Sequence, residues 1–233
     1  MKSISDINLE NASSLKELMT DTQVIERIFA HLDNKTTDMG RATWREPTEH
    51  YGSEQRFKEE YKLLEKTPLM LCPSAAIPEY GSYTTRDVQG VPLVVVRDKN
   101  GQANVFRNAC RHRGVKVASG SGRKKAFVCP YHAWTYDVDG TLKVIPHEHG
   151  FPQINKCDKS LVAVKAIETQ GLIFVCLDQD NSISTLDNLP ELVPQGYRLY
   201  DQSQAELSAN WKTILESFLE GYHIKATHPK SFF

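Results

Sequence analysis

Two short segments of the chain each carry a histidine two or three residues after a cysteine. They are Cys110-Arg-His112 and Cys129-Pro-Tyr-His132, with sixteen residues between them. Two thiolates and two imidazoles on two loops can hold a [2Fe-2S] cluster in which the cysteines bind one iron and the histidines the other. A zinc site uses the same atoms, but zinc modules usually carry a Cys-x2-4-Cys pair and a His-x3-5-His pair. The alternation of cysteine and histidine therefore favours the iron–sulfur cluster over zinc.

A second group of polar side chains lies near the end of the sequence. Glu216, Glu220 and His223 are four and three residues apart, which puts them on one face of a helix predicted over residues 211–223. The other face of this helix is apolar, with Ile214, Leu215, Phe218 and Leu219. His228 lies five residues beyond His223, so the chain must bulge or leave the helix before it. Taken alone, this Glu-x2-His-x4-His pattern is a weak motif, because ordinary surface residues could produce it.

Short strands surround the first group. Segments 91–97 and 103–107 flank Asn100-Gly101, which is a strong β-hairpin signal. A second turn, Asp137-Val-Asp-Gly140, separates predicted strands at 133–136 and 141–145, and further strands are predicted at 161–167 and 172–177. Closely spaced short strands predict a small antiparallel sandwich or barrel over residues 80–178.

Helical patterns flank these strands. Residues 14–33 are predicted to form one or two amphipathic helices that begin with a capping box at Ser14 and Glu17, and residues 55–65 are predicted to form a charged helix. The fold class is therefore α+β. A helical extension (1–45) precedes the antiparallel β domain with its leading segment (46–178), and a linker (179–197) leads to the start of a second α+β domain (198–233).

Composition excludes several classes of function. The 233 residues include 28 Lys and Arg against 29 Asp and Glu. The chain therefore lacks the excess of positive charge that is typical of nucleic-acid-binding proteins. The apolar runs are too short to span a bilayer, and the N-terminus has the pattern of neither a signal nor a transit peptide. We therefore expect a cytoplasmic protein without membrane contact. Its five cysteines are expected to be reduced or metal-bound, not paired in disulfides.

At these residues the sequence resembles a known family. CRHRG and CPYHAWTY are similar to the two cluster loops of Rieske domains, and the segment from Asn210-Trp-Lys212 to His228-Pro229 resembles the NWK...ExxHxxxxHP motif of Rieske non-haem iron oxygenase α-subunits. Respiratory Rieske proteins carry an extra cysteine in each loop, where this chain has Val115 and Tyr131, so that branch is excluded. Ala133 stands where the family usually has glycine.

The resemblance implies a role for each candidate residue. The Rieske [2Fe-2S] cluster would be held by Cys110, His112, Cys129 and His132. His223 and His228 would bind a mononuclear Fe(II), and Glu220 would couple that iron to the cluster of an adjacent subunit. The family's third iron ligand is an acidic residue farther downstream, and no carboxylate follows His228 here, while the spacing of Asp201 and Glu206 does not support either as a substitute. We therefore interpret the chain as the N-terminal part of an α-subunit, with little or no turnover by itself.

The same resemblance implies a redox class and partners. The segment Ala-Trp-Thr after His132 lacks the hydroxyl donor of high-potential clusters. We therefore expect the cluster to have a lower reduction potential than those clusters. A flavin reductase, with or without a ferredoxin, would pass NAD(P)H electrons to the cluster, and intact members assemble as homotrimers, some with a β-subunit. Seven basic residues within 107–125 are interpreted either as a docking patch for an acidic donor or as a solvated loop.

The substrate would be a small organic molecule that is hydroxylated or oxidatively demethylated. Many family members have aspartate where this chain has Glu220, and glutamate resembles the monooxygenases of quaternary ammonium compounds. Two other functions remain open from the residues. One is a Rieske electron-transfer protein without oxygenase activity of its own, and the other is a zinc-stabilised binding module.

Overall fold

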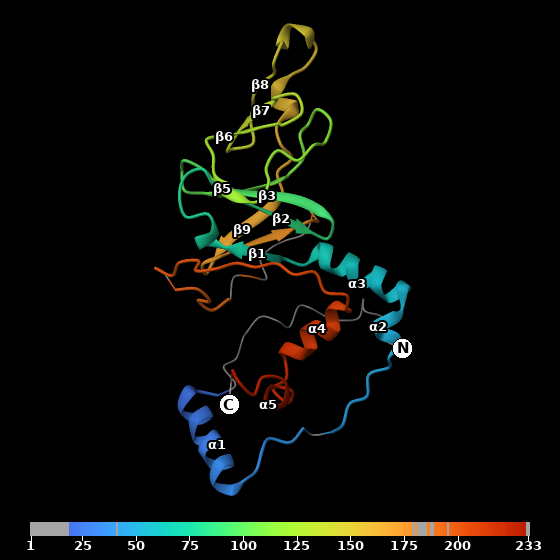
Figure 1. Cartoon of the computed structure of the whole chain (residues 1–233), viewed down its shortest axis with the longest axis vertical. Coiled ribbons are helices and arrows are strands. Elements are labelled where there is room, and N and C mark those ends of the chain that lie inside the picture. The colour runs from blue at the N-terminus through green and yellow to red at the C-terminus, as the bar shows by residue number, and fades with distance from the viewer. Residues whose placement is uncertain are drawn as a thin grey trace. The chain divides into compact units, whose positions relative to one another are not determined.

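The computed structural model describes residues 19–231, except for 41, 179, 181–185, 187, 188 and 195 (Figure 1). Within this part of the chain, residues 61–200 form one compact unit, and residues 19–60 together with 201–231 form another. The capping box predicted at Ser14 and Glu17 lies outside the described residues.

The unit of residues 61–200 is built from antiparallel sheets, as the sequence predicted (Figure 1). One sheet has the order β1 (Leu69–Pro73), β10 (Leu172–Cys176), β9 (Lys165–Thr169). Another has the order β4 (Ala103–Arg107), β3 (Val91–Arg97), β2 (Ser82–Val88), β5 (Ser121–Arg123). A small sheet follows with β6 (Ala126–Val128), β7 (Thr135–Asp137), β8 (Leu142–Val144). The connections contain the short 3-10 helices η3 (Ser74–Ala76), η4 (Glu148–Gly150) and η5 (Lys156–Lys159).

Strand β3 lies at the centre of this unit because both of its faces are buried. Val94 and Val96 pack into the core beneath β6, β7 and β8, whereas Leu93 and Val95 pack into the core shared with β1 and β10. Successive side chains of a strand point to opposite faces, so a continuous apolar run is what a strand between two layers requires.

The predicted hairpin at Asn100-Gly101 is confirmed. Strand β3 pairs with β4, from Leu93 opposite Arg107 to Arg97 opposite Ala103. Gly101 has a φ of 79°, a left-handed conformation that glycine adopts without strain. The strand predicted from residue 161 is wrong in its start, because β9 begins at Lys165. Residues 162 and 164 instead bond to the edge of β4, where the Arg107 amide donates to the Val162 carbonyl at 2.8 Å.

An ion pair between the buried Arg97 and the partly exposed Glu168 joins the two larger sheets. Arg97 of β3 donates to both carboxylate oxygens of Glu168 of β9, at 2.5 and 2.8 Å. The same guanidinium also donates to the carbonyls of Ile77 and Gly101, at 2.9 and 3.0 Å. Burial is the largest single influence and raises the pKa of Glu168, but hydrogen bonding and the positive charge of Arg97 together leave that pKa below its usual value.

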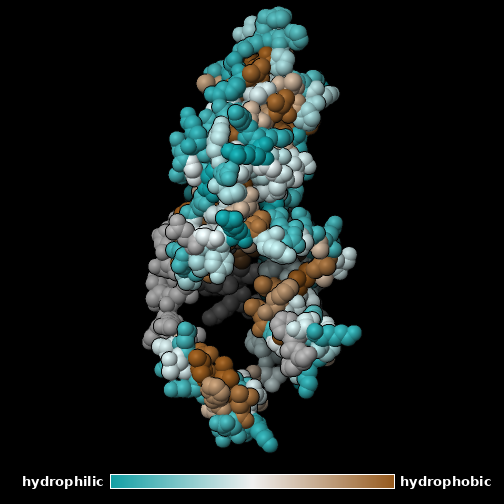
Figure 2. Space-filling view, turned by 60° about the vertical axis from the view of Figure 1, so that its left-hand side comes forward, coloured by the Kyte–Doolittle hydropathy of each residue, from teal (hydrophilic) through white to brown (hydrophobic). Residues whose placement is uncertain are grey.

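The second unit is mainly helical. It contains α1 (Asp21–Asn34), α2 (Glu49–Gly52), the first half of α3 (Glu54–Lys66), α4 (Trp211–Phe218) and α5 (Ile224–Thr227). Helix α1 starts with a capping box formed by Thr20 and Gln23, and Figure 2 shows its apolar side chains as an exposed brown patch. The charged helix predicted at 55–65 is confirmed as α3. No helix in the described ranges is both long and apolar enough to cross a membrane.

Candidate metal centres

The first cysteine–histidine loop follows strand β4 and is closed by two backbone hydrogen bonds. The Cys110 amide donates to the Val115 carbonyl, and the Gly114 amide donates back to the Cys110 carbonyl, both at 2.8 Å. The buried Asn108 holds the segment that follows, because its side chain bonds the amides of Val117 and Ala118 and the carbonyl of Ala118. Asn108 lies two residues before Cys110, and this closeness to the cysteine–histidine motif is the one sequence signal that could have identified its role in holding the loop.

The second loop, between β6 and β7, repeats this arrangement. The Cys129 amide donates to the Trp134 carbonyl at 2.8 Å, and the Ala133 amide donates to the Cys129 carbonyl at 2.9 Å. Each loop is thus closed between its cysteine and the residues four and five positions later. The fourth residue after each cysteine has a positive φ, which is 77° at Gly114 and 56° at Ala133. This shared turn explains why the family usually has glycine at position 133.

Replacing Ala133 with glycine is expected to stabilise the chain by about 1 kcal/mol, because glycine adopts a positive φ without the steric penalty of a Cβ. The reciprocal variant Gly114→Ala should destabilise it by a similar amount, since a Cβ at Gly114 would meet no atom within 4 Å and only the backbone penalty remains. Thermal unfolding of the cluster-loaded protein measures both changes. A lower midpoint for Ala133→Gly would contradict the shared-turn interpretation.

The four predicted cluster ligands come together at the tips of these loops. Cys110 and Cys129 are 4% and 3% exposed and belong to the same apolar core. The rings of His112 and His132 lie with their centroids 4.7 Å apart. His132 is exposed and stacks on Tyr131, whereas the half-buried His112 stacks on Trp134. The structure therefore pairs sulfur with sulfur and imidazole with imidazole.

The surroundings of these side chains suit a bound metal cluster. His112 Nδ1 is buried and has no hydrogen-bond partner, a costly arrangement that a metal ligand bond removes. Burial, followed by the nearby His132 and Arg113, lowers the pKa of His112 and keeps its imidazole neutral, which is the form that binds metal. Burial raises the pKa of the Cys110 thiol, so thiolates here need the positive charge of a metal.

Among the described residues, no group of three or more His, Cys, Asp and Glu side chains has the geometry to hold a single metal ion. A [2Fe-2S] cluster does not need such a group, because each iron takes only two protein ligands and shares the bridging sulfides. A four-ligand zinc site would require both cysteines and both histidines to converge on one point. The donor set thus fits the two-iron cluster better than zinc.

Tyr136 is a functional residue that the sequence reasoning missed. Its side chain is fully buried, and its hydroxyl lies 3.3 Å from Cys110 Sγ. The same hydroxyl oxygen accepts the Arg111 amide at 2.9 Å, so its own proton is available to the sulfur. Burial and the contact with Cys110 raise the pKa of Tyr136, which keeps the phenol protonated as a donor. The sequence showed that the hydroxyl donor found after the second histidine of high-potential clusters is missing. It did not show that the Tyr136 hydroxyl lies beside Cys110.

Tyr136→Phe is expected to lower the reduction potential of the cluster, because a hydrogen bond to a ligand sulfur stabilises the more negative reduced state. If the bond contributes about 1 kcal/mol to the reduced form, the one-electron potential falls by about 40 mV. A redox titration followed by electron paramagnetic resonance measures this shift. Tyr83→Phe is the matched control, since its hydroxyl bonds the Ser119 carbonyl in the same core and no sulfur. Equal potentials for Tyr136→Phe and the unsubstituted chain would exclude the role.

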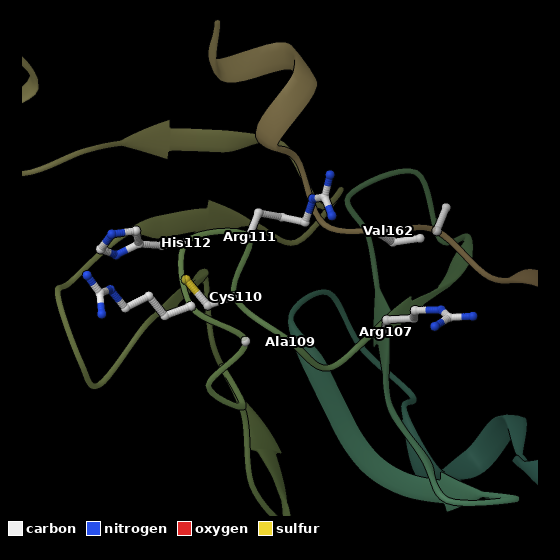
Figure 3. A pocket seen from close by; sticks show the side chains of 9 residues that line it. Arg107, Ala109, Cys110, Arg111, His112 and Val162 are labelled. Atoms are coloured by element: carbon white, nitrogen blue, oxygen red, sulfur yellow. The ribbon is translucent and has the colours of Figure 1, made fainter. Parts of the chain in front are cut away.

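A basic pocket of about 480 Å³ opens beside the first loop. Figure 3 shows Cys110 and His112 on one side of it and Arg107 and Val162 on the other. Arg111 and Arg113 also line the pocket. Of the seven basic residues noted in the sequence, the structure therefore brings three arginines to one cavity next to the cluster ligands.

The second candidate centre lies after helix α4. The helix predicted over 211–223 is wrong in its length, because α4 ends at Phe218 and a turn separates it from α5. The Glu220 carboxylate caps this turn by accepting the amides of Tyr222 and His223, and Gly221 disfavours a continuous helix. Glu216 therefore does not share a helical face with Glu220 and His223.

This turn nevertheless brings the three predicted residues together. The Glu220 carboxylate contacts Nδ1 of His223, and the ring centroids of His223 and His228 are 5.7 Å apart. Hydrogen bonding to His223 lowers the pKa of Glu220. The two neighbouring imidazoles fit two of the protein ligands of a mononuclear iron, and the Glu220 carboxylate fits a group that orients one of these ligands. Neither Asp201 nor Glu206 completes a three-ligand group with them in the described chain.

Two family models match the chain in these regions. Residues 67–158 match the Rieske [2Fe-2S] domain, and residues 194–232 match the ring hydroxylating alpha subunit (catalytic domain). The first match contains both cysteine–histidine loops, and the second contains the turn from Glu220 to His228.

Characterised proteins are similar over most of the chain. The carnitine monooxygenase oxygenase subunit of Acinetobacter pittii (strain PHEA-2) is 32% identical over 197 residues, which are 80% of this chain and 53% of that protein. The glycine betaine monooxygenase oxygenase subunit of Chromohalobacter salexigens is 30% identical over 220 residues, 90% of this chain and 49% of that protein. The chain also matches the solved structure of a quaternary ammonium Rieske monooxygenase, with a TM-score of 0.70 and 30% identity. The match covers 80% of this chain and 54% of that one. That structure is described as giving insights into carnitine oxidation by gut microbiota and inter-subunit electron transfer.

The chain spans about half the length of the curated relatives it matches. Within that half it carries the cysteine–histidine loops and the histidine turn in the two regions that the family models cover. The chain belongs to the α-subunits of the Rieske non-haem iron oxygenases.

Proposed function

We propose that this chain relays electrons through a Rieske cluster to a mononuclear iron site that oxidises a quaternary ammonium compound. The observation that carries the proposal is the pairing of two cysteines and two histidines at the tips of two matched loops, in a chain that also joins Glu220 to a histidine pair. A site for electrons and a site for O2 are the two parts that such a reaction requires.

Each residue has a defined task in this proposal. Cys110 and Cys129 hold one iron of the cluster and His112 and His132 hold the other; when bound, the cluster accepts and donates single electrons. His223 and His228 supply two ligands of the mononuclear iron, which when bound activates O2. The Glu220 carboxylate holds Nδ1 of His223, and this contact sets the orientation of the ring and directs its other nitrogen to the metal.

The substrate proposal rests on the relatives and on Glu220. Both curated relatives act on quaternary ammonium compounds, carnitine and glycine betaine, and glutamate at this position resembles such enzymes. One oxygen atom of O2 enters a C–H bond next to the ammonium nitrogen, and the other leaves as water with two protons. NAD(P)H supplies the two electrons through a reductase. The carbon that then carries both hydroxyl and nitrogen loses the amine as its C–N bond breaks.

The basic pocket supports an acidic electron donor as partner. Arg107, Arg111 and Arg113 line it next to His112, and none of these three side chains forms an ion pair with another described residue. Carboxylates on a reductase or ferredoxin would complement these charges close to the cluster. We also propose that the intact protein is a multimer, which the inter-subunit electron transfer described for the solved relative supports.

Electrostatic docking predicts that electron transfer slows as salt increases. The rate of cluster reduction by the reductase should fall steeply between low ionic strength and 0.5 M salt, where the Debye length is below about 10 Å. Stopped-flow absorbance of the cluster measures this rate. Arg111→Gln should flatten the salt dependence, whereas Lys143→Gln, outside the pocket, should not. A rate that is independent of salt would contradict docking through these arginines.

The domain limits remain our proposal as well. We place the Rieske domain with its leading segment at 46–178 and the start of the catalytic domain at 198–233, joined by the linker 179–197. The family matches at 67–158 and 194–232 support this division.

The first test is the metal content of the protein purified without air. Two irons and two acid-labile sulfides per chain, with a Rieske signal in electron paramagnetic resonance after dithionite reduction, are expected. A further iron that disappears in His223→Ala is expected for the second site. Zinc without labile sulfide would overturn the proposal in favour of a zinc module, and a cluster without the further iron would favour an electron-transfer protein.

The second test compares substrates. In an α-subunit of the relatives' length that contains this chain, supplied with NADH and a reductase, carnitine or glycine betaine should stimulate O2 consumption and release an amine, whereas a neutral aromatic hydrocarbon should not. Stimulation by the hydrocarbon alone would overturn the substrate proposal and leave the metal sites unaffected.

A further inference from the structure

Glu60 is the only carboxylate that the described part of the chain buries, at 7% exposure. It lies on α3, a helix whose other carboxylates are exposed. Its oxygens accept Lys212 Nζ at 2.6 and 2.8 Å, Trp211 Nε1 at 3.3 Å and Arg56 Nε at 3.1 Å. Burial is the largest single influence and raises the pKa of Glu60, but the hydrogen bonds from Lys212, Trp211 and Arg56 and the charge of Lys212 together leave that pKa below its usual value. A buried carboxylate is expensive to desolvate, and here two cationic partners and an indole donor offset that cost.

Two of the three partners of Glu60, Trp211 and Lys212, are the first residues of helix α4. Asn210 caps this helix by accepting the Lys212 amide at 2.9 Å, and its side-chain amide donates to the Tyr51 carbonyl at 2.6 Å. All three residues of the Asn-Trp-Lys tripeptide therefore bond within this unit to α2 or α3, which lie beside α4 (Figure 1).

A second contact holds α4 one turn farther along. The Tyr51 hydroxyl donates to both oxygens of Glu216 at 2.9 Å. Glu216 lies four residues before Glu220, at the end of the helix that leads directly into the histidine turn. The helix has no buried residue of its own, so these polar contacts and not an apolar core determine its orientation.

We propose that Glu60 is a positioning residue of the mononuclear iron site, which it orients by binding Trp211 and Lys212, while Tyr51 holds Glu216. The contacts fix both ends of α4 and thereby the direction in which the following turn presents Glu220, His223 and His228. The proposal rests on the iron site proposed above. Loss of an orienting partner around a metal site typically weakens metal binding about 10-fold to 100-fold.

The test titrates Co(II) into the full, cluster-loaded chain and follows the visible d–d bands of the bound metal. Glu60→Gln should weaken Co(II) binding about 10-fold or more, and Glu60→Asp should restore part of the loss because it keeps the charge. At saturating Co(II), the bands of Glu60→Gln should differ in position and intensity from those of the unsubstituted chain. A merely less stable fold would give fewer sites with unchanged bands, so this readout isolates positioning.

Control variants separate the possible outcomes. Glu59→Gln removes an exposed carboxylate from the same helix and should change neither affinity nor bands. Tyr51→Phe removes one hydroxyl without opening the core and should shift the bands in the same direction as Glu60→Gln. The electron paramagnetic resonance of the Rieske cluster should be unchanged in all variants. Unaltered Co(II) affinity and bands in Glu60→Gln, with binding lost in His223→Ala, would overturn the inference alone; binding that survives His223→Ala would overturn the iron site itself.

Discussion

Cys129→Ser is expected to give a colourless protein without acid-labile sulfide. Cys129 is 3% exposed, its side chain interacts with that of Cys110, and serine supplies no thiolate to the cluster iron. The loss should be complete, because one iron would keep a single protein ligand. Iron and sulfide analysis together with the visible spectrum measure it.

The chain contains a matched control for this loss. Cys157 is exposed, and all five cysteines are free of disulfides, as the sequence predicted. Cys157→Ser should therefore retain full cluster content. A Cys129→Ser protein with normal sulfide and an unchanged Rieske signal would disprove the ligand assignment.

Arg97→Met is expected to cost about 1–3 kcal/mol of unfolding free energy, the largest stability effect that we predict, because the buried guanidinium is lost from several acceptors at once. The substitution leaves the Glu168 carboxylate without its partner and removes the donors of the Ile77 and Gly101 carbonyls. Since β3 and β9 belong to different sheets, the packing between those sheets should loosen as well. Urea unfolding followed by circular dichroism measures the change.

Arg123→Met is the control for a surface ion pair. Arg123 bonds Glu79 at 2.8 Å, but both side chains are more than half exposed, at 63% and 65%, so the loss should be no more than about 1 kcal/mol. If Arg97→Met were as mild as Arg123→Met, the Arg97–Glu168 pair would not be the link between the sheets.

The candidate iron–sulfur ligands could be proposed from the sequence because ligand type and spacing are local properties. Cys110, His112, Cys129 and His132 lie in two segments of three and four residues, and a loop that short must carry its donors to the same place. The hairpin at Asn100-Gly101 was predictable for a similar reason, since its turn chemistry is contained in neighbouring residues.

The length of the last helix was not predictable from the same kind of pattern. The apolar and acidic residues of 211–223 have helical spacing, but α4 ends at Phe218. The Glu220 side chain bonds the backbone of the turn in place of a helical carbonyl, and Gly221 offers little resistance to the break. The periodicity of a sequence shows only which side chains are apolar. It does not show that the Glu220 side chain competes with helical carbonyls for the backbone amides of the turn.

The sequence by itself determined the donor set, the antiparallel β domain around it and the family, because each depends on residues close together in the chain. Only the tertiary structure decided that Tyr136 donates to Cys110, that Arg97 pairs with Glu168 and that Glu60 binds Lys212. These partners are 26, 71 and 152 residues apart. Hydrogen bonds and buried ion pairs depend on distances of a few ångströms between atoms, and the folded backbone alone sets such distances for residues far apart in sequence.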